Sequence, residues 1–231
     1  IMIQGDTTTV LSATLAAFYR KIPIAHVEAG LRTWDLNAPW PEEANRIICS
    51  KLATLHFCPT QENYRNLIKD NIPKKNIYIT GNTVIDALFI TLKKLKKLPP
   101  PQISTLPNYI TNNKKNKIVL ITGHRRENFG EAFSSICRAI AKLAKTFTNT
   151  IFIYPVHLNP NVQKPVQEIL KVEQLPNLFL IKPLSYPDFV YLMNKAYIIL
   201  TDSGGVQEEA PSLGKPVLVM RDKTERPEAL E

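Results

Sequence analysis

The sequence predicts an α/β protein made of two doubly wound parallel sheets. Short β-rich runs alternate with helical patterns along almost all of the 231 residues. Several of these runs, such as "KIVLIT" and "TIFIYPV", are nearly continuous in hydrophobic residues. Runs of that kind are typical of parallel strands covered on both faces. Regular alternation of strands with helices favours a doubly wound architecture.

The expected elements follow one another in a regular order. Apolar runs predict strands at residues 1–4, 22–27, 54–58, 77–80, 117–122, 150–155, 178–182, 197–201 and 216–220. The stretches between them have helical periodicity and predict helices near 9–19, 41–52, 61–70, 84–95, 130–146, 160–171, 186–195 and 205–213.

Residues 98–116, "LPPPQISTLPNYITNNKKN", interrupt this rhythm. Four prolines and a polar, lysine-rich end are typical of a connection between domains. We therefore expect an N-terminal Rossmann-like domain at 1–97, a linker at 98–116 and a C-terminal Rossmann-like domain at 117–231. The chain begins inside an apparent strand, "IMIQGD", and ends in "TERPEALE" where a helix seems to start, which predicts a fragment lacking both ends.

Composition narrows the class of protein. A hydrophobic share of 44% and a charged share of 21% are typical of a globular protein, and no apolar run is as long as a membrane span. The net charge of +9 permits a nucleic-acid partner, but many lysines fall in "LKKLKKL" and "NKKNK", which we interpret as solvated charge. We expect neither a nucleic acid nor a membrane as partner.

Cysteines and histidines give no metal signature. Cys49, Cys58 and Cys137 form no CxxC pair, and the four histidines have no HxxxH spacing. We expect no metal site, and three scattered thiols favour the reducing cytoplasm.

The stretch "TDSGGVQEEA" follows an expected strand and opens an expected helix. Ser203, Gly204 and Gly205 would expose unpaired backbone N–H groups at the positive end of the helix dipole, where a phosphate can bind. Glu209 lies one turn further and can accept hydrogen bonds from sugar hydroxyls. The alternative is that Ser203 only caps the helix. The pattern is not GxGxxG, so a nicotinamide cofactor is not indicated.

A second strand end carries "TGHRRENFG", with His124, Arg125 and Arg126. These cations can neutralise a diphosphate, although Glu127 could equally pair with an arginine in a structural turn. His157 ends another strand of the same half.

Acidic residues occupy the corresponding places in the N-terminal half. Asp6 in "QGDTTT" and Glu28 in "HVEAGLRT" follow strands, and Glu42 in "PWPEEANR" opens a helix. Carboxylates that converge at one edge can remove and return a proton. The alternatives are that Asp6 caps a helix and that Glu42 only favours the dipole. His26 is more typical of a core histidine than of a ligand.

Taken in order with "ITGNTVIDAL", "PVHLNPNV" and "TERPE", these motifs resemble those of the non-hydrolysing UDP-N-acetylglucosamine 2-epimerases over nearly the whole chain. The resemblance implies a GT-B-like pair of Rossmann-like domains facing a cleft. It implies interconversion of UDP-N-acetylglucosamine and UDP-N-acetylmannosamine by elimination and re-addition of UDP, with proton exchange at sugar carbon 2 and no cofactor. It also implies a homodimer and a cytoplasmic role in polysaccharide biosynthesis.

The resemblance assigns roles to individual residues. The implied catalytic residues are Asp6, Glu28, Glu42 and His124. The implied substrate-binding residues are Phe189 at the uracil, Ser203, Gly204, Gly205, Glu209 and Arg226. Arg126 and His157 correspond to positions near an activating second UDP-N-acetylglucosamine. Leu184 stands where a glutamine is expected beside the uracil.

Two other hypotheses remain open from the sequence. One is a GT-B glycosyltransferase, which would share the UDP site but would not need Asp6, Glu28 and Glu42 together. The other is an inactive fragment that binds UDP.

Overall fold

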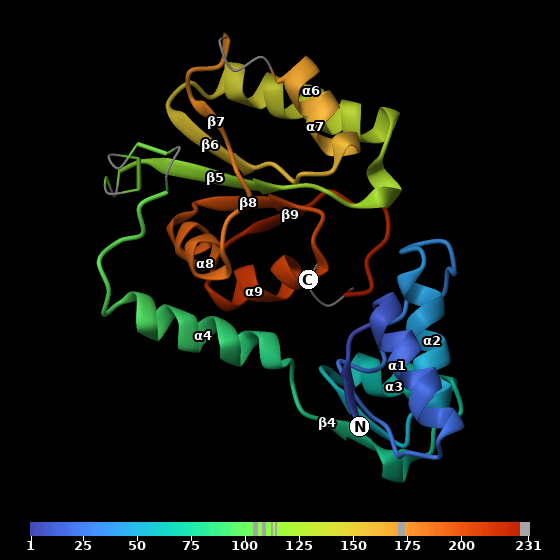
Figure 1. Cartoon of the computed structure of the whole chain (residues 1–231). Coiled ribbons are helices and arrows are strands. Elements are labelled where there is room, and N and C mark those ends of the chain that lie inside the picture. The colour runs from blue at the N-terminus through green and yellow to red at the C-terminus, as the bar shows by residue number, and fades with distance from the viewer. Residues whose placement is uncertain (104–105, 108–109, 112, 114, 171–173, 227–231) are drawn as a thin grey trace. The chain divides into compact units, whose positions relative to one another are not determined.

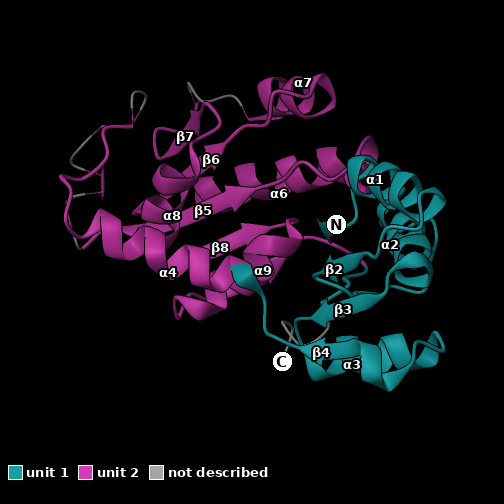
Figure 2. Cartoon of the chain, turned by 60° about the horizontal axis from the view of Figure 1, so that its bottom comes forward, with its two compact units in different colours: residues 1–83, 223–227 teal, residues 84–222, 228–231 magenta. Residues whose placement is uncertain are grey.

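The structure is a computed structural model that describes the whole chain except residues 104–105, 108–109, 112, 114, 171–173 and 227–231. It contains two compact units: residues 1–83 with 223–226, and residues 84–222 (Figure 2). Within the described residues, no helix is both long and apolar enough to cross a membrane.

Unit 1 is a four-stranded parallel sheet in the order β1-β2-β3-β4. Its elements are β1 (Met2–Gln4), α1 (Thr8–Tyr19), β2 (Ala25–Val27), α2 (Glu42–Leu52), β3 (Leu55–Cys58), α3 (Gln61–Lys69), η1 (Lys74–Asn76) and β4 (Ile77–Ile79). Because neighbouring strands follow one another in sequence, right-handed crossovers place all three α-helices on one face.

Local signals in the sequence explain where these helices begin. The Thr7 side chain caps α1 by accepting a hydrogen bond from the Val10 N–H group. Thr60 and Asn63 form a reciprocal capping box at the start of α3. Asp6 therefore does not cap α1, and its carboxylate is left to make other contacts.

Unit 2 is a five-stranded parallel sheet in the order β7-β6-β5-β8-β9. Its elements are α4 (Thr83–Leu95, whose first residue falls in unit 1), β5 (Lys117–Thr122), η2 (Arg126–Asn128), α6 (Glu131–Thr146), β6 (Thr150–Pro155), α7 (Pro160–Ile169), β7 (Leu178–Ile181), α8 (Tyr186–Lys195), β8 (Ile198–Thr201), α9 (Gly204–Ser212) and β9 (Val217–Val219). The strand order reverses at β5, whose neighbours are β6 and β8.

Helices cover both faces of the unit 2 sheet (Figure 1). Residues of α6 and α7, including Phe133 and Val162, form one buried cluster with the sheet. Residues of α8, α9 and α4, including Leu192 and Leu88, form another on the opposite face. The expected doubly wound α/β fold is therefore confirmed for this unit, and the expected strands and helices are all present with ends shifted by at most a few residues.

The two units divide at a different place from the expected linker. The division falls between Thr83 and Val84, and the chain returns to unit 1 at Lys223. Ile103, Leu106 and Ile110, inside the stretch expected to be a linker, are buried in the same cluster as Leu88 of α4. The four prolines of this stretch predicted a linker, but its three apolar residues pack onto unit 2.

Candidate active site

The reversal of strand order in unit 2 creates a place for a ligand. In open α/β sheets, ligands bind outside the carboxyl ends of the strands at such a switch point. Here β5 leads into Gly123 and His124, and β8 leads into Asp202 and Ser203. The Thr122 and Thr201 hydroxyls are 2.5 Å apart, which ties the two strand ends together.

A pocket of about 210 Å³ lies at this point, entirely within unit 2. It brings together several residues singled out from the sequence, which lie far apart along the chain. Its lining residues are Thr122, Gly123, His124, Pro155, His157, Pro183, Leu184, Phe189, Ser203 and Val206. Leu184, Phe189 and the prolines contribute apolar groups to the lining, whereas the histidines and Ser203 contribute polar groups.

His124 is held by its surroundings. Its ring stacks on the His157 ring, with centroids 5.3 Å apart and planes 14° from parallel. Its Nδ1 atom is 3.6 Å from Asp202 Oδ1. Burial lowers the pKa of His124, as do the charge of Arg125 and the neighbouring His157, while Asp202 acts in the opposite direction. At neutral pH the free imidazole is therefore mostly uncharged.

The start of α9 retains the features expected of a phosphate site. Ser203 is the N-cap residue, yet within the described residues its side chain makes no capping hydrogen bond. The alternative that Ser203 merely caps the helix is therefore not what the structure has. The first backbone N–H groups of α9 have no partner within the helix, as in any helix N-terminus.

Glu209 lies one turn into α9 and is almost buried, with 6% of its surface exposed. Its Oε1 atom accepts a hydrogen bond of 2.7 Å from the Tyr186 hydroxyl. A Cβ atom on Gly205 would lie 3.7 Å from Glu209 Oε2, so the carboxylate lies beside the glycine turn. Burial raises the pKa of Glu209, with a smaller contribution from Glu208 and an opposing one from Tyr186.

The arginines after β5 have separate environments. Arg126 lies on η2 and is not among the lining residues of the pocket. Glu127 does pair with an arginine, as the structural alternative held, but the partner is Arg221, at 2.6 Å.

In unit 1, Asp6 follows β1 and forms an ion pair with Arg46 of α2. The distance from Asp6 Oδ2 to Arg46 Nη2 is 2.6 Å. Arg46 Nη1 in turn donates to Glu43 Oε2 at 3.1 Å. Glu43 is fully buried, and its Oε1 atom accepts hydrogen bonds from the Thr33 and Trp34 N–H groups. The helix α2 and the loop after β2 are thereby fixed around Asp6.

Glu28 is also bound by an arginine in unit 1. Arg226 Nη2 donates to Glu28 Oε1 at 2.8 Å, and Arg226 Nη1 donates to the buried Glu225 at 2.5 Å. Glu28 has a positive φ of 64°, and its Oε2 atom would lie 3.6 Å from a Cβ on Gly5. Glu28 therefore lies beside the turn that leads to Asp6.

Glu42 occupies the first turn of α2, where it favours the helix dipole. The neighbouring Glu43 has a different surrounding because successive helical residues point about 100° apart. Sequence reasoning gave Glu43 and Arg46 no role, although their i,i+3 spacing in "PEEANR" was a signal. It also gave none to Asp202, which directly precedes the glycine turn.

His26 is a core residue, as expected. Its Nε2 atom is 2.8 Å from the Gly5 carbonyl oxygen, and it pairs in register with the buried His56 of β3. Burial lowers the pKa of His56 to about 4, with a contribution from His26.

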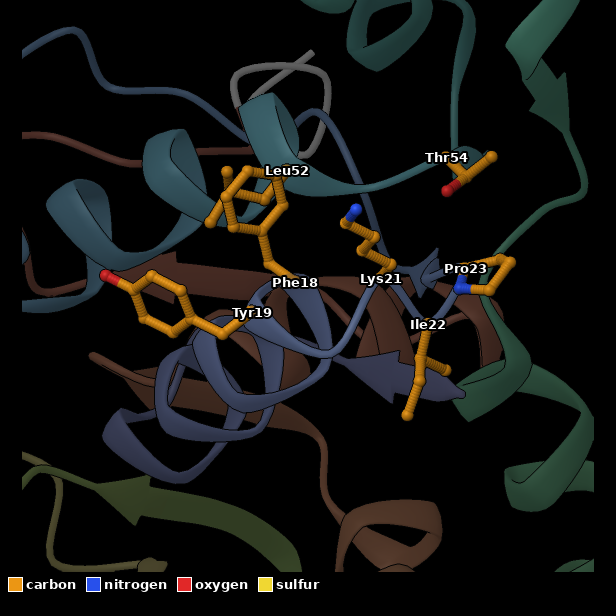
Figure 3. A pocket seen from close by; sticks show the side chains of 7 residues that line it. All are labelled: Phe18, Tyr19, Lys21, Ile22, Pro23, Leu52 and Thr54. Carbon is orange, nitrogen blue, oxygen red and sulfur yellow. The ribbon is translucent and has the colours of Figure 1, made fainter.

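A second pocket, of about 500 Å³, lies at the opposite end of the unit 1 sheet (Figure 3). Its side chains come from the end of α1, the following turn and the end of α2, including Phe18, Lys21 and Leu52. Pro23 and Thr54 precede β2 and β3, so this pocket adjoins the amino ends of the strands, away from Asp6 and Glu28. Among the residues that the structure describes, no three or more His, Cys, Asp or Glu side chains lie close enough together to hold a metal ion.

Comparison with known proteins places these features in a family. Residues 1–231 match the family described as UDP-N-acetylglucosamine 2-epimerase. The curated UDP-N-acetylglucosamine 2-epimerases of Yersinia pestis and Campylobacter jejuni are 55% and 56% identical to the chain, over 231 and 234 residues. Each alignment covers 100% of the chain but 61% of the relative, so the chain spans less than two thirds of their length.

Solved structures agree. UDP-GlcNAc 2-epimerase from Neisseria meningitidis bound to UDP-GlcNAc matches with a TM-score of 0.91 at 52% identity, covering 99% of this chain and 61% of that one. The Methanocaldococcus jannaschii enzyme in complex with UDP-GlcNAc and UDP matches with a TM-score of 0.81 at 34% identity, covering 99% and 62%.

Proposed function

Because this chain belongs to the UDP-N-acetylglucosamine 2-epimerase family, we propose that it provides the catalytic residues for interconverting UDP-N-acetylglucosamine and UDP-N-acetylmannosamine. The proposal extends the activity of relatives that are longer than this chain. It rests on one observation above all: two carboxylates, Asp6 and Glu28, lie near each other at the carboxyl ends of β1 and β2, each bound to an arginine.

The reaction is an elimination followed by an addition. A carboxylate takes the proton from sugar carbon 2, a carbon–carbon double bond forms between carbons 1 and 2, and the C1–O bond breaks with its electron pair leaving on UDP. UDP then adds back to carbon 1 while carbon 2 receives a proton on the opposite face. Asp6, Glu28 and Glu42 are the candidates for these two proton transfers.

Unit 2 supplies groups suited to the nucleotide. His124 and the N-terminus of α9 can meet the diphosphate, Glu209 the ribose, and Phe189 the uracil. Leu184 offers the base an apolar contact where the family has a glutamine, which would cost roughly 1 kcal/mol of binding free energy. His157 and Arg126 would contact a second, activating UDP-N-acetylglucosamine. Among the residues assigned to the nucleotide, Arg226 is the least available for direct contact with it, because its guanidinium already donates hydrogen bonds to Glu28 and Glu225.

The decisive experiment is incubation of the purified chain with UDP-N-acetylglucosamine in D₂O, followed by proton NMR of sugar carbon 2. The proposal predicts loss of that proton signal together with appearance of the manno isomer. Isomer formed with its carbon-2 proton retained would contradict the elimination route.

Glu42→Gln and Glu62→Gln form a matched pair for this assay. Both glutamates lie in the first turn of a helix, but Glu62 forms a surface ion pair with Arg65 of the same helix. We expect the Glu42 variant to lose exchange by 10²-fold or more, as is typical of an acid–base residue, and the Glu62 variant to keep it.

The same assay separates the epimerase from both alternative functions, because neither a glycosyltransferase nor an inactive UDP-binding fragment would exchange the carbon-2 proton. Transfer of the sugar from the UDP-sugar to an acceptor would identify a glycosyltransferase. Retained UDP binding with neither exchange nor transfer would favour the inactive fragment.

A homodimer in the cytoplasm completes the proposal. The three cysteines are free and buried, which suits a reducing compartment. Light scattering of the purified chain tests the dimer, and a monomer at micromolar concentration would count against it.

A further inference from the structure

Asp202 has no role in the proposed function, yet it is the most deeply buried acidic group among the described residues of unit 2. It directly follows β8 and is fully buried. Its Oδ2 atom accepts hydrogen bonds from the His124 and Arg125 N–H groups at 2.8 and 2.9 Å, and from Asn128 Nδ2 at 3.2 Å. Asp202 therefore holds the turn after β5 against the end of β8.

The second carboxylate oxygen is in a different situation. Within the described part of the chain, Asp202 Oδ1 is buried and makes no hydrogen bond. Buried polar atoms are nearly always paired, so an unpaired one requires an explanation. The Nδ1 atom of His124 lies 3.6 Å from Asp202 Oδ1, so that a slight rotation of the imidazole would bring it within hydrogen-bonding distance.

We propose that Asp202 is a positioning residue for His124: it holds the imidazole with a proton on Nδ1, so that Nε2 is the nitrogen that meets a nucleotide diphosphate in the pocket. An ionised carboxylate only accepts hydrogen bonds, so Oδ1 selects the Nδ1–H tautomer. The stacked His157 ring restricts movement of the imidazole out of its plane.

This orientation has a consequence for binding. A neutral imidazole with its proton on Nδ1 presents a lone pair on Nε2, which cannot donate to phosphate oxygens. Nε2 must therefore take up a proton when a diphosphate binds, and Asp202 stabilises the imidazolium that results. Burial, Arg125 and His157 oppose this charge in the free protein, whereas Asp202 favours it. A bound diphosphate would also favour it. The binding arm of this inference rests on the proposed function, while the tautomer of the free protein does not.

The tautomer is tested by long-range proton–nitrogen NMR on ¹⁵N-histidine-labelled chain above pH 8, with the His124 signals assigned from a His124→Gln variant. We expect Nδ1 to carry the proton in the unaltered chain. In Asp202→Asn, the amide oxygen can still accept from the turn while its NH₂ group faces Nδ1, which should shift the proton to Nε2. A neutral His124 protonated on Nε2 in the unaltered chain overturns the proposal, even if Asp202→Asn fails to fold.

Calorimetry of UDP binding at pH 7.5, in buffers of different ionisation enthalpy, tests the second step. We expect proton uptake approaching one per UDP in the unaltered chain and in the control Asp86→Asn, whose carboxylate is exposed on α4. Uptake should disappear in His124→Gln and fall in Asp202→Asn, with affinity roughly tenfold weaker because a charge-assisted hydrogen bond becomes neutral. Uptake unchanged in Asp202→Asn contradicts the positioning role, whereas failure of the unaltered chain to bind UDP contradicts the proposed nucleotide site and leaves the tautomer result standing.

Discussion

The two units bury different kinds of side chain. Unit 2 places large apolar clusters on both faces of its sheet, with Phe133 and Phe152 in one and Leu120 and Leu192 in the other. The apolar clusters of unit 1 are small, and its interior instead holds Arg32, Glu43, Arg46 and the two histidines. Unit 1 thus depends on paired charges for its internal order, whereas unit 2 depends on hydrophobic burial.

This difference has a functional reason in the proposed mechanism. Carboxylates that move protons must be held among polar partners, so the unit that carries them contains a polar interior. The unit that binds a nucleotide needs mainly a rigid sheet edge with a few polar groups. Both tryptophans of the chain, Trp34 and Trp40, lie in unit 1, so their fluorescence reports the unfolding of that unit alone.

The largest expected effect on the free energy of unfolding comes from breaking the buried ion pair between Arg46 and Glu43 in unit 1. Arg46→Met leaves the fully buried Glu43 without its cation, and we expect a loss of about 3–5 kcal/mol in the free energy of unfolding. Arg65→Met breaks another arginine–glutamate pair of the same i,i+3 spacing, but at the surface, and should cost less than about 1 kcal/mol. Urea unfolding followed by tryptophan fluorescence measures both, and equal losses would contradict the dependence of unit 1 on buried charge.

A backbone substitution tests whether steric fit also matters in unit 1. Gly30 and Gly81 both have positive φ, at 91° and 76°. A Cβ on Gly30 would lie 2.4 Å from the Asn63 carbonyl oxygen, whereas one on Gly81 has no heavy atom of the described residues within 4 Å. We expect Gly30→Ala to destabilise unit 1 by roughly 3 kcal/mol and Gly81→Ala by about 1 kcal/mol. Similar urea midpoints for the two variants would mean that the chain around Asn63 moves freely.

Acid should weaken unit 1 through its buried histidines. The pKa of His56 is about 4 in the folded chain and 6.5 when unfolded, so the unfolded state binds more protons between these values. The contribution of His56 to the free energy of unfolding is complete above pH 6.5 and is lost as the pH falls toward 4. This loss amounts to about 2 kcal/mol between pH 7.5 and 5. His26 adds to it because burial lowers its pKa too.

His56→Leu provides the measurement for this pH dependence. The free energy of unfolding of unit 1, followed by tryptophan fluorescence, should change less between pH 7.5 and 5 in the variant than in the unaltered chain. An identical pH dependence in both would show that His56 does not remain neutral in the folded unit.

The smallest expected effect lies in unit 2. Tyr186→Phe removes the hydroxyl that bonds Glu209, and loss of this bond raises the pKa of Glu209 further above its ordinary value. Because the proposed ribose contact needs the carboxylate, UDP affinity should fall a few-fold, with the loss beginning at higher pH than in the unaltered chain. Calorimetry across pH 5.5–8 measures this, with Tyr197→Phe, an exposed tyrosine, as the control. An equal pH dependence of UDP affinity in Tyr186→Phe and in the unaltered chain would show that Glu209 does not bind the ribose.

Local sequence determined most of the secondary structure of this protein. Hydrophobic runs, helical periodicity and turn residues predicted the described strands of both sheets and the longer helices between them, because backbone hydrogen bonding and periodicity are local properties. The carboxyl ends of parallel strands share an edge, so the sequence also predicted a ligand crevice at these strand ends, whereas only the structure placed His157 in the same pocket as His124 and Ser203.

Contacts between distant residues were decided only by the tertiary structure. The partners of Asp6, Glu28 and Asp202 are Arg46, Arg226 and the turn at His124, which lie 40, 198 and 78 residues away. The packing of Ile103 and Leu106 onto α4 was not predicted, because the prolines around them are typical of a linker. Spacing along a chain carries no information about such pairings, since they depend on where each element packs and on which buried charge needs a partner.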